Sequence, residues 1–171
     1  SDVCELYADA AKLVKRFANL LRSQKTKSEI HILPLKPIFT TLRKIANNSL
    51  VQGASGHGYH FDSSCANDVV RGRIVCRSME DIQLQIANFD TIFSTVEVVG
   101  TENRFGCPGL DSWADYRVYF VFRDDEKRHV CEVQFVHSKL LLQRDCLGVG
   151  PWQKCLSLAT GYVRLVQLCQ K

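Results

Sequence analysis

The sequence lacks the patterns that mark several special classes of protein. No apolar run approaches the roughly 20 residues that a helix needs to cross a bilayer, and no signal-peptide pattern opens the chain. Its four prolines and ten glycines are too few for a collagen-like or low-complexity chain. We therefore expect 171 residues folded as one globular domain without a membrane partner. Because the chain begins at Ser1 without a methionine, we expect it to be one domain of a longer protein.

The eight cysteines form no C-x-x-C pair, so the spacings typical of structural zinc sites are absent. Cys76 and Cys131 fall in apolar, strand-like runs, and Cys155 and Cys169 lie near leucines in a helical stretch. We interpret them as buried, reduced thiols that pack as small hydrophobic side chains, and we expect an intracellular protein. Pairing of the cysteines as disulfides is the alternative.

Acidic residues are scarce between residues 12 and 44. Residues 12–44 contain nine lysines and arginines but one acidic residue, Glu29. The net charge of the whole chain is only +4, which does not by itself indicate nucleic-acid binding. The local excess fits a polyanion such as nucleotide phosphates or RNA, and a solvated helix face is the alternative.

Hydrophobic periodicity predicts an α+β (mixed α/β) domain, 1–171, in which helices flank a small central mixed sheet. We expect helices over 2–22, from Ile38 to just before Asn47, over 79–89, and in two closing segments, the last from Trp152 to Val166. Strands are expected over 69–76, 93–99, 116–122 and 129–135. We expect loops over 52–64 and 100–114, and a charged hairpin connection over 123–128.

Two expected strands carry acidic residues that a structural strand does not need. Alternation places Val130, Glu132 and Gln134 on one face of their strand. A carboxylate held there can bind Mg²⁺ or take a proton from an attacking hydroxyl. The alternative is a solvated outer face of an antiparallel sheet.

A second carboxylate, Asp68, lies where a loop enters a strand that also carries Arg71 and Arg73. Two carboxylates with nearby arginines are typical of a metal–nucleotide site, in which carboxylates hold Mg²⁺ and arginines neutralise phosphate oxygens. Strict alternation points Asp68 and Arg73 to opposite faces. Either Asp68 precedes the regular strand or a bulge intervenes.

The order of these motifs resembles the synthetase domain of the RelA/SpoT-type (p)ppGpp synthetases. The matching segments are Asp68-x-x-x-x-Arg73-Ile74, Met79-Glu80-Asp81-Ile82, Asp115-Tyr116-Arg117 and Glu132-Val133-Gln134. Residues 34–45 align without gaps with the basic segment and following helix of that family, so the resemblance covers about residues 30–140. Enzymes of this family transfer pyrophosphate from ATP to the 3′-hydroxyl of a guanine nucleotide.

The resemblance implies a divergent, Mg²⁺-dependent pyrophosphotransferase that uses ATP as the donor. Asp68 and Glu132 would hold the metal, and Gln134 would support Glu132, which also lies near the attacking hydroxyl. Lys36 and Thr40 would bind the ATP phosphates.

Arginines and a tyrosine would complete this site. By the same resemblance, Arg73 would line the ATP side, Tyr116 would stack on the acceptor base, and Arg71 and Arg117 would contact the acceptor.

Several positions depart from the family pattern. Pro34 replaces its first basic arginine, Arg71 replaces a glycine, and Phe120 replaces a histidine. A catalytically degenerate module with the same fold is therefore the alternative. Such a module would bind a nucleotide, an RNA, a protein partner or a flanking domain.

The acceptor side also carries unexpected acidic residues. Asp111 and Asp115 would repel the polyphosphate of GDP or GTP unless Mg²⁺ or Arg104 compensates. An acceptor with fewer phosphates, or an RNA 3′ end, therefore fits better than GDP or GTP.

Two further motifs support weaker hypotheses. His57-x-x-His60 with Cys65 could hold zinc, although a fourth ligand is not evident. Trp113 beside Tyr116 could form a base-stacking platform, and an anchor in the core or in a loop is the alternative.

Overall fold

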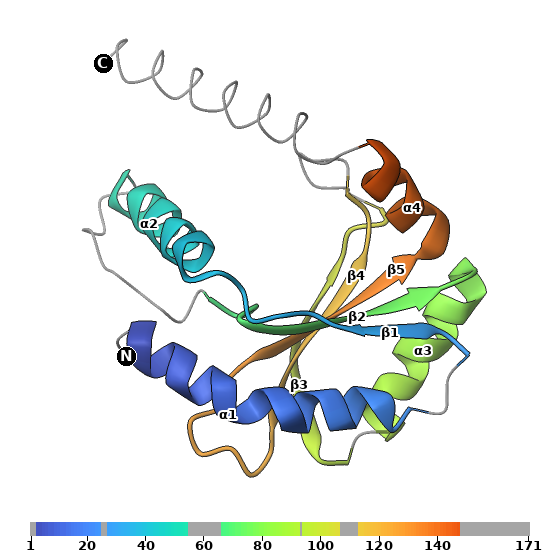
Figure 1. Ribbon diagram of the computed structural model, residues 1–171, viewed down its shortest axis with the longest axis horizontal. Helices are drawn as coiled ribbons and strands as arrows, with labels where there is room; N and C mark the ends of the chain where they lie inside the picture. Colours follow the sequence, from blue (N-terminus) through green and yellow to red (C-terminus); the bar gives the residue numbers. More distant parts are fainter. Residues whose placement is uncertain (1–2, 25–26, 55–65, 93, 107–112, 148–171) are drawn as a thin grey trace.

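The computed structural model describes residues 3–24, 27–54, 66–92, 94–106 and 113–147. These residues form four helices and five strands (Figure 1). In chain order they are α1 (Val3–Arg22), β1 (Glu29–Ile32), α2 (Ile38–Ala54), β2 (Val70–Cys76), α3 (Met79–Ile92), β3 (Val96–Asn103), β4 (Tyr116–Phe122), β5 (Cys131–His137) and α4 (Ser138–Leu147). Among the helices of this described part, none is long and apolar enough to cross a membrane.

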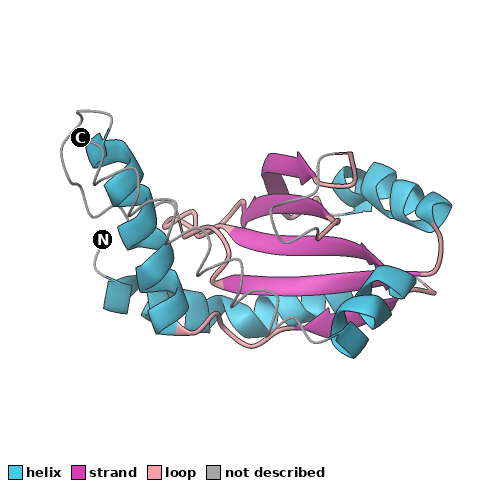
Figure 2. Ribbon diagram, turned by 90° about the horizontal axis from the view of Figure 1, so that it is seen from above, coloured by secondary structure: helices cyan, strands magenta, loops and turns pink. Residues whose placement is uncertain are grey.

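The strands form one mixed sheet in the order β1-β2-β5-β4-β3. β2 and β5 run parallel, and the other neighbouring strands are antiparallel. Helices α1 and α3 cover one face of the sheet, whereas α2 and α4 lie at its two ends on the other side (Figures 1 and 2). This arrangement confirms the α+β fold with a small mixed sheet that the sequence predicts.

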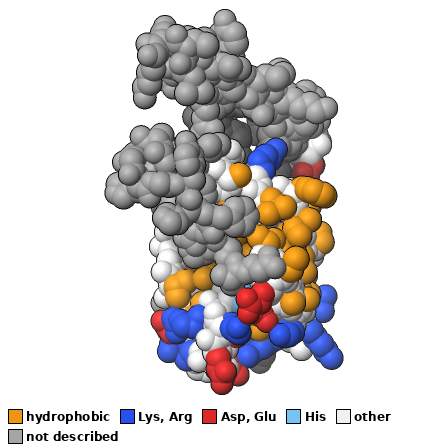
Figure 3. All heavy atoms as spheres, turned by 90° about the vertical axis from the view of Figure 1, so that its left-hand side faces the viewer, with side chains coloured by type: hydrophobic (Ala, Val, Ile, Leu, Met, Phe, Trp, Pro, Cys, Tyr) orange, Lys and Arg blue, Asp and Glu red, His pale blue; other side chains and the backbone are white. Residues whose placement is uncertain are grey.

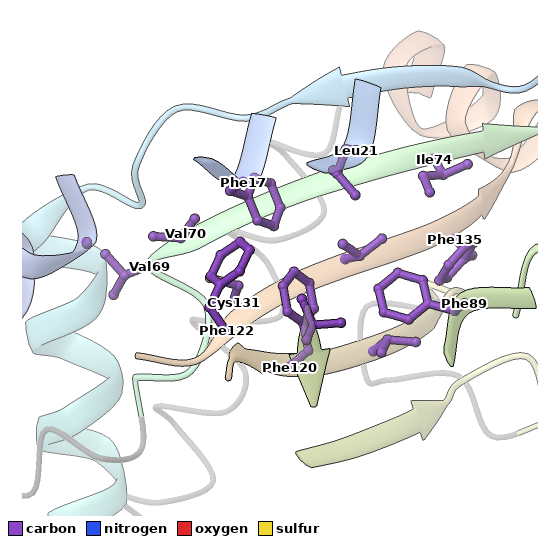
Figure 4. Close-up of a cluster of buried hydrophobic side chains, with 14 of the residues drawn as sticks. Phe17, Leu21, Val69, Val70, Ile74, Phe89, Phe120, Phe122, Cys131 and Phe135 are labelled. Atoms are coloured by element: carbon purple, nitrogen blue, oxygen red, sulfur yellow. The ribbon is translucent and has the colours of Figure 1, made fainter. Parts of the chain in front are cut away.

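The main core lies between the sheet and the helices α1 and α3. Figure 4 shows Phe17 and Leu21 of α1 against β2, and Phe89 of α3 beside Phe120 and Phe135 of the sheet. The rings of Phe17 and Phe120 stack with their centroids 5.9 Å apart. This face is therefore dry and close-packed, which leaves the opposite face for polar chemistry.

Several elements differ from the sequence prediction: the strand expected over 129–135 is Cys131–His137, and the helix expected over 79–89 continues to Ile92. Strand β1 was not predicted, because its four residues gain their hydrogen bonds only by pairing with β2. Helix α2 runs past Asn47 to Ala54. Strand β3 continues through Gly100 to Asn103. The register of its pairing with β4 shifts between Val98 and Gly100, and this irregularity interrupts the alternation from which the end of the strand was predicted.

Two of the predicted buried thiols are confirmed. Cys76 and Cys131 are fully buried and are not bonded to another cysteine. The side chains of the other predicted core cysteines, Cys155 and Cys169, lie outside the described residues, as does the closing helix over 152–166.

The basic N-terminal third separates into two sets of side chains. On α1, Lys12 pairs with Asp9, and Arg16 pairs with Asp124 of the hairpin between β4 and β5. In Figure 3, which views the molecule from its α2 side, acidic and basic side chains are mixed at the lower edge. This part of α1 is therefore a solvated, ion-paired helix face, whereas Lys36, Arg43 and Lys44 lie beside or on α2.

Candidate functional site

Polar side chains gather on the face of the sheet opposite to α1 and α3. Residues opposite one another in neighbouring strands share a face. The residues brought together in this way are Arg71 and Arg73 on β2, Glu132 and Gln134 on β5, and Arg117 and Tyr119 on β4. Since β5 lies between β2 and β4, Glu132 stands near the centre of this polar face.

Glu132 is buried, with only 1% of its surface exposed. Gln134 Nε2 donates a hydrogen bond of 2.6 Å to Glu132 Oε1. The other oxygen, Oε2, has no hydrogen-bond partner among the described residues, and Arg117 Nη1 lies 3.8 Å from it. Burial raises the pKa of Glu132, and the charge of Arg117 and the bond from Gln134 only partly oppose this shift. The alternative of a solvated outer face is therefore wrong for this residue.

Asp68 lies just before β2. It therefore precedes the regular strand, and no bulge is needed to explain its position relative to Arg73. Lys36 Nζ donates to its Oδ2, and Lys44 Nζ donates to its Oδ1 at 3.2 Å. Burial raises the pKa of this carboxyl, but the bond from Lys36 and the charge of Lys44 outweigh burial and hold the pKa below its ordinary value. Asp68 is therefore an ionised carboxylate shared by two ammonium groups.

Backbone and side-chain bonds fix the position of Lys36. Its N–H donates to the carbonyl of Val69 at 3.1 Å, which holds the segment before α2 alongside the start of β2. The hydroxyl of Tyr7 on α1 donates to the carbonyl of Lys36 and lies 2.7 Å from the hydroxyl of Thr41. Lys36 is thus tied to α1, α2 and Asp68 at once.

A basic pocket of about 280 Å³ opens beside Lys36, along the N-terminal half of α2. Its lining residues are Lys36, Thr40, Arg43, Lys44 and Asn47. Three cations near the positive end of a helix are a suitable site for phosphate. The sequence predicted Lys36 and Thr40 for this role. It missed Arg43, Lys44 and Asn47, although steps of three and four from Thr40 place them on one side of the helix.

A buried ion cluster lies at the other end of the polar face. Asp115 is fully buried, and its carboxylate accepts hydrogen bonds from Arg104 Nε at 2.7 Å, Trp113 Nε1 at 2.9 Å and Arg117 Nε at 3.2 Å. Arg104 thus compensates the charge of Asp115, as the sequence allowed. Trp113 is buried as well, so it is an anchor of this cluster and not an exposed stacking platform.

The structure does not bring Tyr116 to the polar face. Its register partner is Phe135, whose ring centroid lies 6.5 Å away on the side of α1 and α3. The tyrosine that shares a face with Glu132 is Tyr119, which the sequence analysis missed although it has the same alternation as Arg117. Tyr119 donates its hydroxyl hydrogen to Glu102 at 3.2 Å, and burial raises its pKa to about 12.

The described residues contain no group of three or more histidine, cysteine or acidic side chains that could hold a metal ion. A Mg²⁺ ion bound with a nucleotide needs only one or two protein carboxylates. The buried, unpartnered Oε2 of Glu132 fits such an ion, whereas both oxygens of Asp68 already accept bonds from lysines. The proposed zinc ligands His57, His60 and Cys65 lie outside the described residues.

Solved structures share this fold. Small alarmone synthetase 1 from Bacillus subtilis, bound to its product pppGpp, is 14% identical with a TM-score of 0.58, over 92% of this chain and 79% of that chain. Another crystal structure of small alarmone synthetase 1 from Bacillus subtilis is 16% identical with a TM-score of 0.52, over 93% of this chain and 94% of that chain. No family model and no curated protein matches the sequence. The chain therefore has the RelA/SpoT-like fold that its motifs predict.

Proposed function

We propose that this chain is a Mg²⁺-dependent pyrophosphotransferase that moves pyrophosphate from ATP to a ribose 3′-hydroxyl of a nucleotide or an RNA. The observation that carries the proposal is Glu132, a buried carboxylate on the polar face of the sheet whose Oε2 accepts no hydrogen bond from the described residues. A fold shared with a synthetase bound to pppGpp supports the same chemistry.

The donor ATP would bind at the pocket beside α2. Lys36, Arg43 and Lys44 supply positive charge for its phosphates, and Thr40 supplies a hydroxyl. On β2, Arg71 stands opposite Glu132, where a guanidinium would neutralise charge on the transferred group. These groups position the donor, and positioning with charge neutralisation is what phosphoryl transfer mainly requires.

Glu132 would hold Mg²⁺ beside the donor phosphates, where the ion would neutralise charge, and Asp68 would add a second carboxylate only when Lys36 and Lys44 turn from it to the phosphates.

Glu132 is also suited to act as the general base. Its place at the centre of the polar face, between β2 and β4, would bring it within reach of both the donor and the acceptor. The 3′-oxygen of the acceptor bonds to the β-phosphorus of ATP, its proton passes to Glu132, and AMP leaves with the bridging oxygen. Gln134 holds the other oxygen of Glu132 and so fixes the carboxylate in place.

Release of AMP from radiolabelled ATP in the presence of Mg²⁺ tests the proposal, with GMP, GDP, GTP, AMP, ADP and tRNA as acceptors. We expect AMP with at least one acceptor, and none with Glu132→Ala. Glu97→Ala is the matched control, because Glu97 is a glutamate on β3 that pairs with Arg128 of the hairpin. A folded protein that releases no AMP with any acceptor would overturn the proposal.

A nucleotide-binding module without catalysis is the second candidate. The two lysine bonds to Asp68 favour it, because they occupy both oxygens of a predicted metal ligand. This candidate predicts that ATP stabilises the folded protein with or without Mg²⁺, and that no acceptor elicits AMP.

A further inference from the structure

The polar face has two ends that differ in charge. At the α2 end, Lys36, Arg43 and Lys44 line one pocket, and Asp68 is the carboxylate that the structure places between two of them. Arg71 adds a further cation on β2. This end carries an excess of positive charge for an anionic ligand.

The end formed by β3 and β4 carries no such excess among the described residues. Arg104 and Arg117 both bond Asp115, which is fully buried. Arg117 Nη1 also lies 3.6 Å from Glu102 Oε2 and 3.8 Å from Glu132 Oε2. Each guanidinium already forms an ion pair with a carboxylate. An anionic ligand could therefore pair with either arginine only by displacing that carboxylate.

In-line transfer decides which end receives the acceptor. The attacking and leaving oxygens lie on opposite sides of the transferred phosphorus. If the donor occupies the α2 end, with Glu132 at the centre of the sheet, the acceptor approaches over β4 and β3. Glu102, the half-exposed carboxylate of that end, then faces the acceptor together with the ring of Tyr119.

We propose that the acceptor is a ribose 3′-hydroxyl whose nucleoside carries no 5′-diphosphate or triphosphate, and that Glu102 sets this specificity. A nucleoside, a nucleoside monophosphate and the 3′ end of an RNA share this chemistry. A polyphosphate tail would meet the half-exposed carboxylate of Glu102, whereas Asp115 is fully buried beneath its arginine partners. The inference rests on the proposed pyrophosphate transfer and deepens it.

The test compares kcat/KM for guanosine, GMP, GDP and GTP, for the adenosine series, and for a short RNA with either a 3′-hydroxyl or a 3′-deoxy end. We expect kcat/KM to fall at least about tenfold from GMP to GTP, as like-charge contacts near a protein surface predict. The RNA arm shows whether the source is a polynucleotide, since only the 3′-hydroxyl end can react. A preference for GDP or GTP would overturn the acceptor class while leaving pyrophosphate transfer intact.

Two variants test whether Glu102 sets the preference between acceptors. Glu102→Gln, at a half-exposed position, should raise the ratio of kcat/KM for GDP to that for GMP about tenfold, by removal of one like charge. Glu97→Gln, on the same strand as Glu102, should leave the ratio unchanged. Because both acceptors meet the same folded molecules, a loss of stability does not move this ratio. An unchanged ratio in Glu102→Gln would overturn the specificity role.

The absence of AMP release with every acceptor is a different result. It would overturn the proposed transfer itself, and the acceptor class with it.

Discussion

The hydroxyl of Tyr7 on α1 donates a hydrogen bond to the backbone carbonyl of Lys36, whose ammonium group bonds Asp68. This bond joins the first helix to the basic pocket across 29 residues of sequence. Helix α1 thus has two tasks, since its other side packs Phe17 and Leu21 against the sheet. The donor end of the candidate site depends on a residue that is far from it in the chain.

Tyr7→Phe should therefore weaken ATP binding without abolishing it. The substitution keeps the ring but leaves the carbonyl of Lys36 and the fully buried Thr41 without this hydroxyl, which costs about 1–2 kcal/mol of folding free energy. We expect a raised KM for ATP and little change in kcat, measured alongside a urea unfolding curve. A variant that loses stability but keeps the KM of the wild type would show that the bond serves only the fold.

Gly72→Ala should destabilise the protein by about 1–3 kcal/mol through overpacking of the core. A Cβ atom at Gly72 would lie 2.7 Å from Leu21 Cδ1 and 2.9 Å from Phe17 Cε1, in the layer that Figure 4 shows. Gly100→Ala is the matched control, because its Cβ would approach nothing nearer than Tyr119 Cδ2 at 3.8 Å. Urea unfolding of the two variants would contradict this account if Gly100→Ala were the less stable.

The central carboxylates of the candidate site could be predicted because their signals are local. Alternation within one strand places Glu132 beside Gln134, and the position of Asp68 before a strand follows from the residues next to it. The burial of Glu132 and Gln134 could not be predicted from the sequence, because it depends on β5 lying between β2 and β4 in the sheet.

The acceptor end could be predicted less well because it depends on pairing between strands. Tyr119 and Glu102 meet only through the register of β3 and β4, which a shift between Val98 and Gly100 alters. Strand β1 was missed for the same reason, since it exists only as a partner of β2.

Arg43→Gln should reduce ATP affinity and leave the stability of the fold unchanged. Arg43 is exposed and lines the basic pocket, so the change removes a phosphate contact without disturbing the core. ATP at about 100 times its Kd should stabilise the wild type by about 2.7 kcal/mol, and the same concentration should stabilise the variant less. Arg22→Gln, at an exposed position on α1, is the control for loss of charge. Equal protection of the Arg43 and Arg22 variants by ATP would place the donor elsewhere.

Glu132→Gln should abolish transfer and yet stabilise the fold at neutral pH. Burial raises the pKa of Glu132 above the ordinary value of a glutamate, so the folded state disfavours the ionised carboxylate. Above the folded pKa the wild type carries this cost in full, and as pH falls towards 4.5 the carboxyl is protonated and the cost disappears. The glutamine amide keeps an oxygen for the bond from Gln134 Nε2 without the charge. We expect a higher Tm than that of the wild type at pH 7, and a difference that narrows as pH falls. If Glu132→Gln instead lowered the Tm at pH 7, the ion contact with Arg117 would outweigh burial, and Glu132 would be a structural ion pair and not a strained catalytic group.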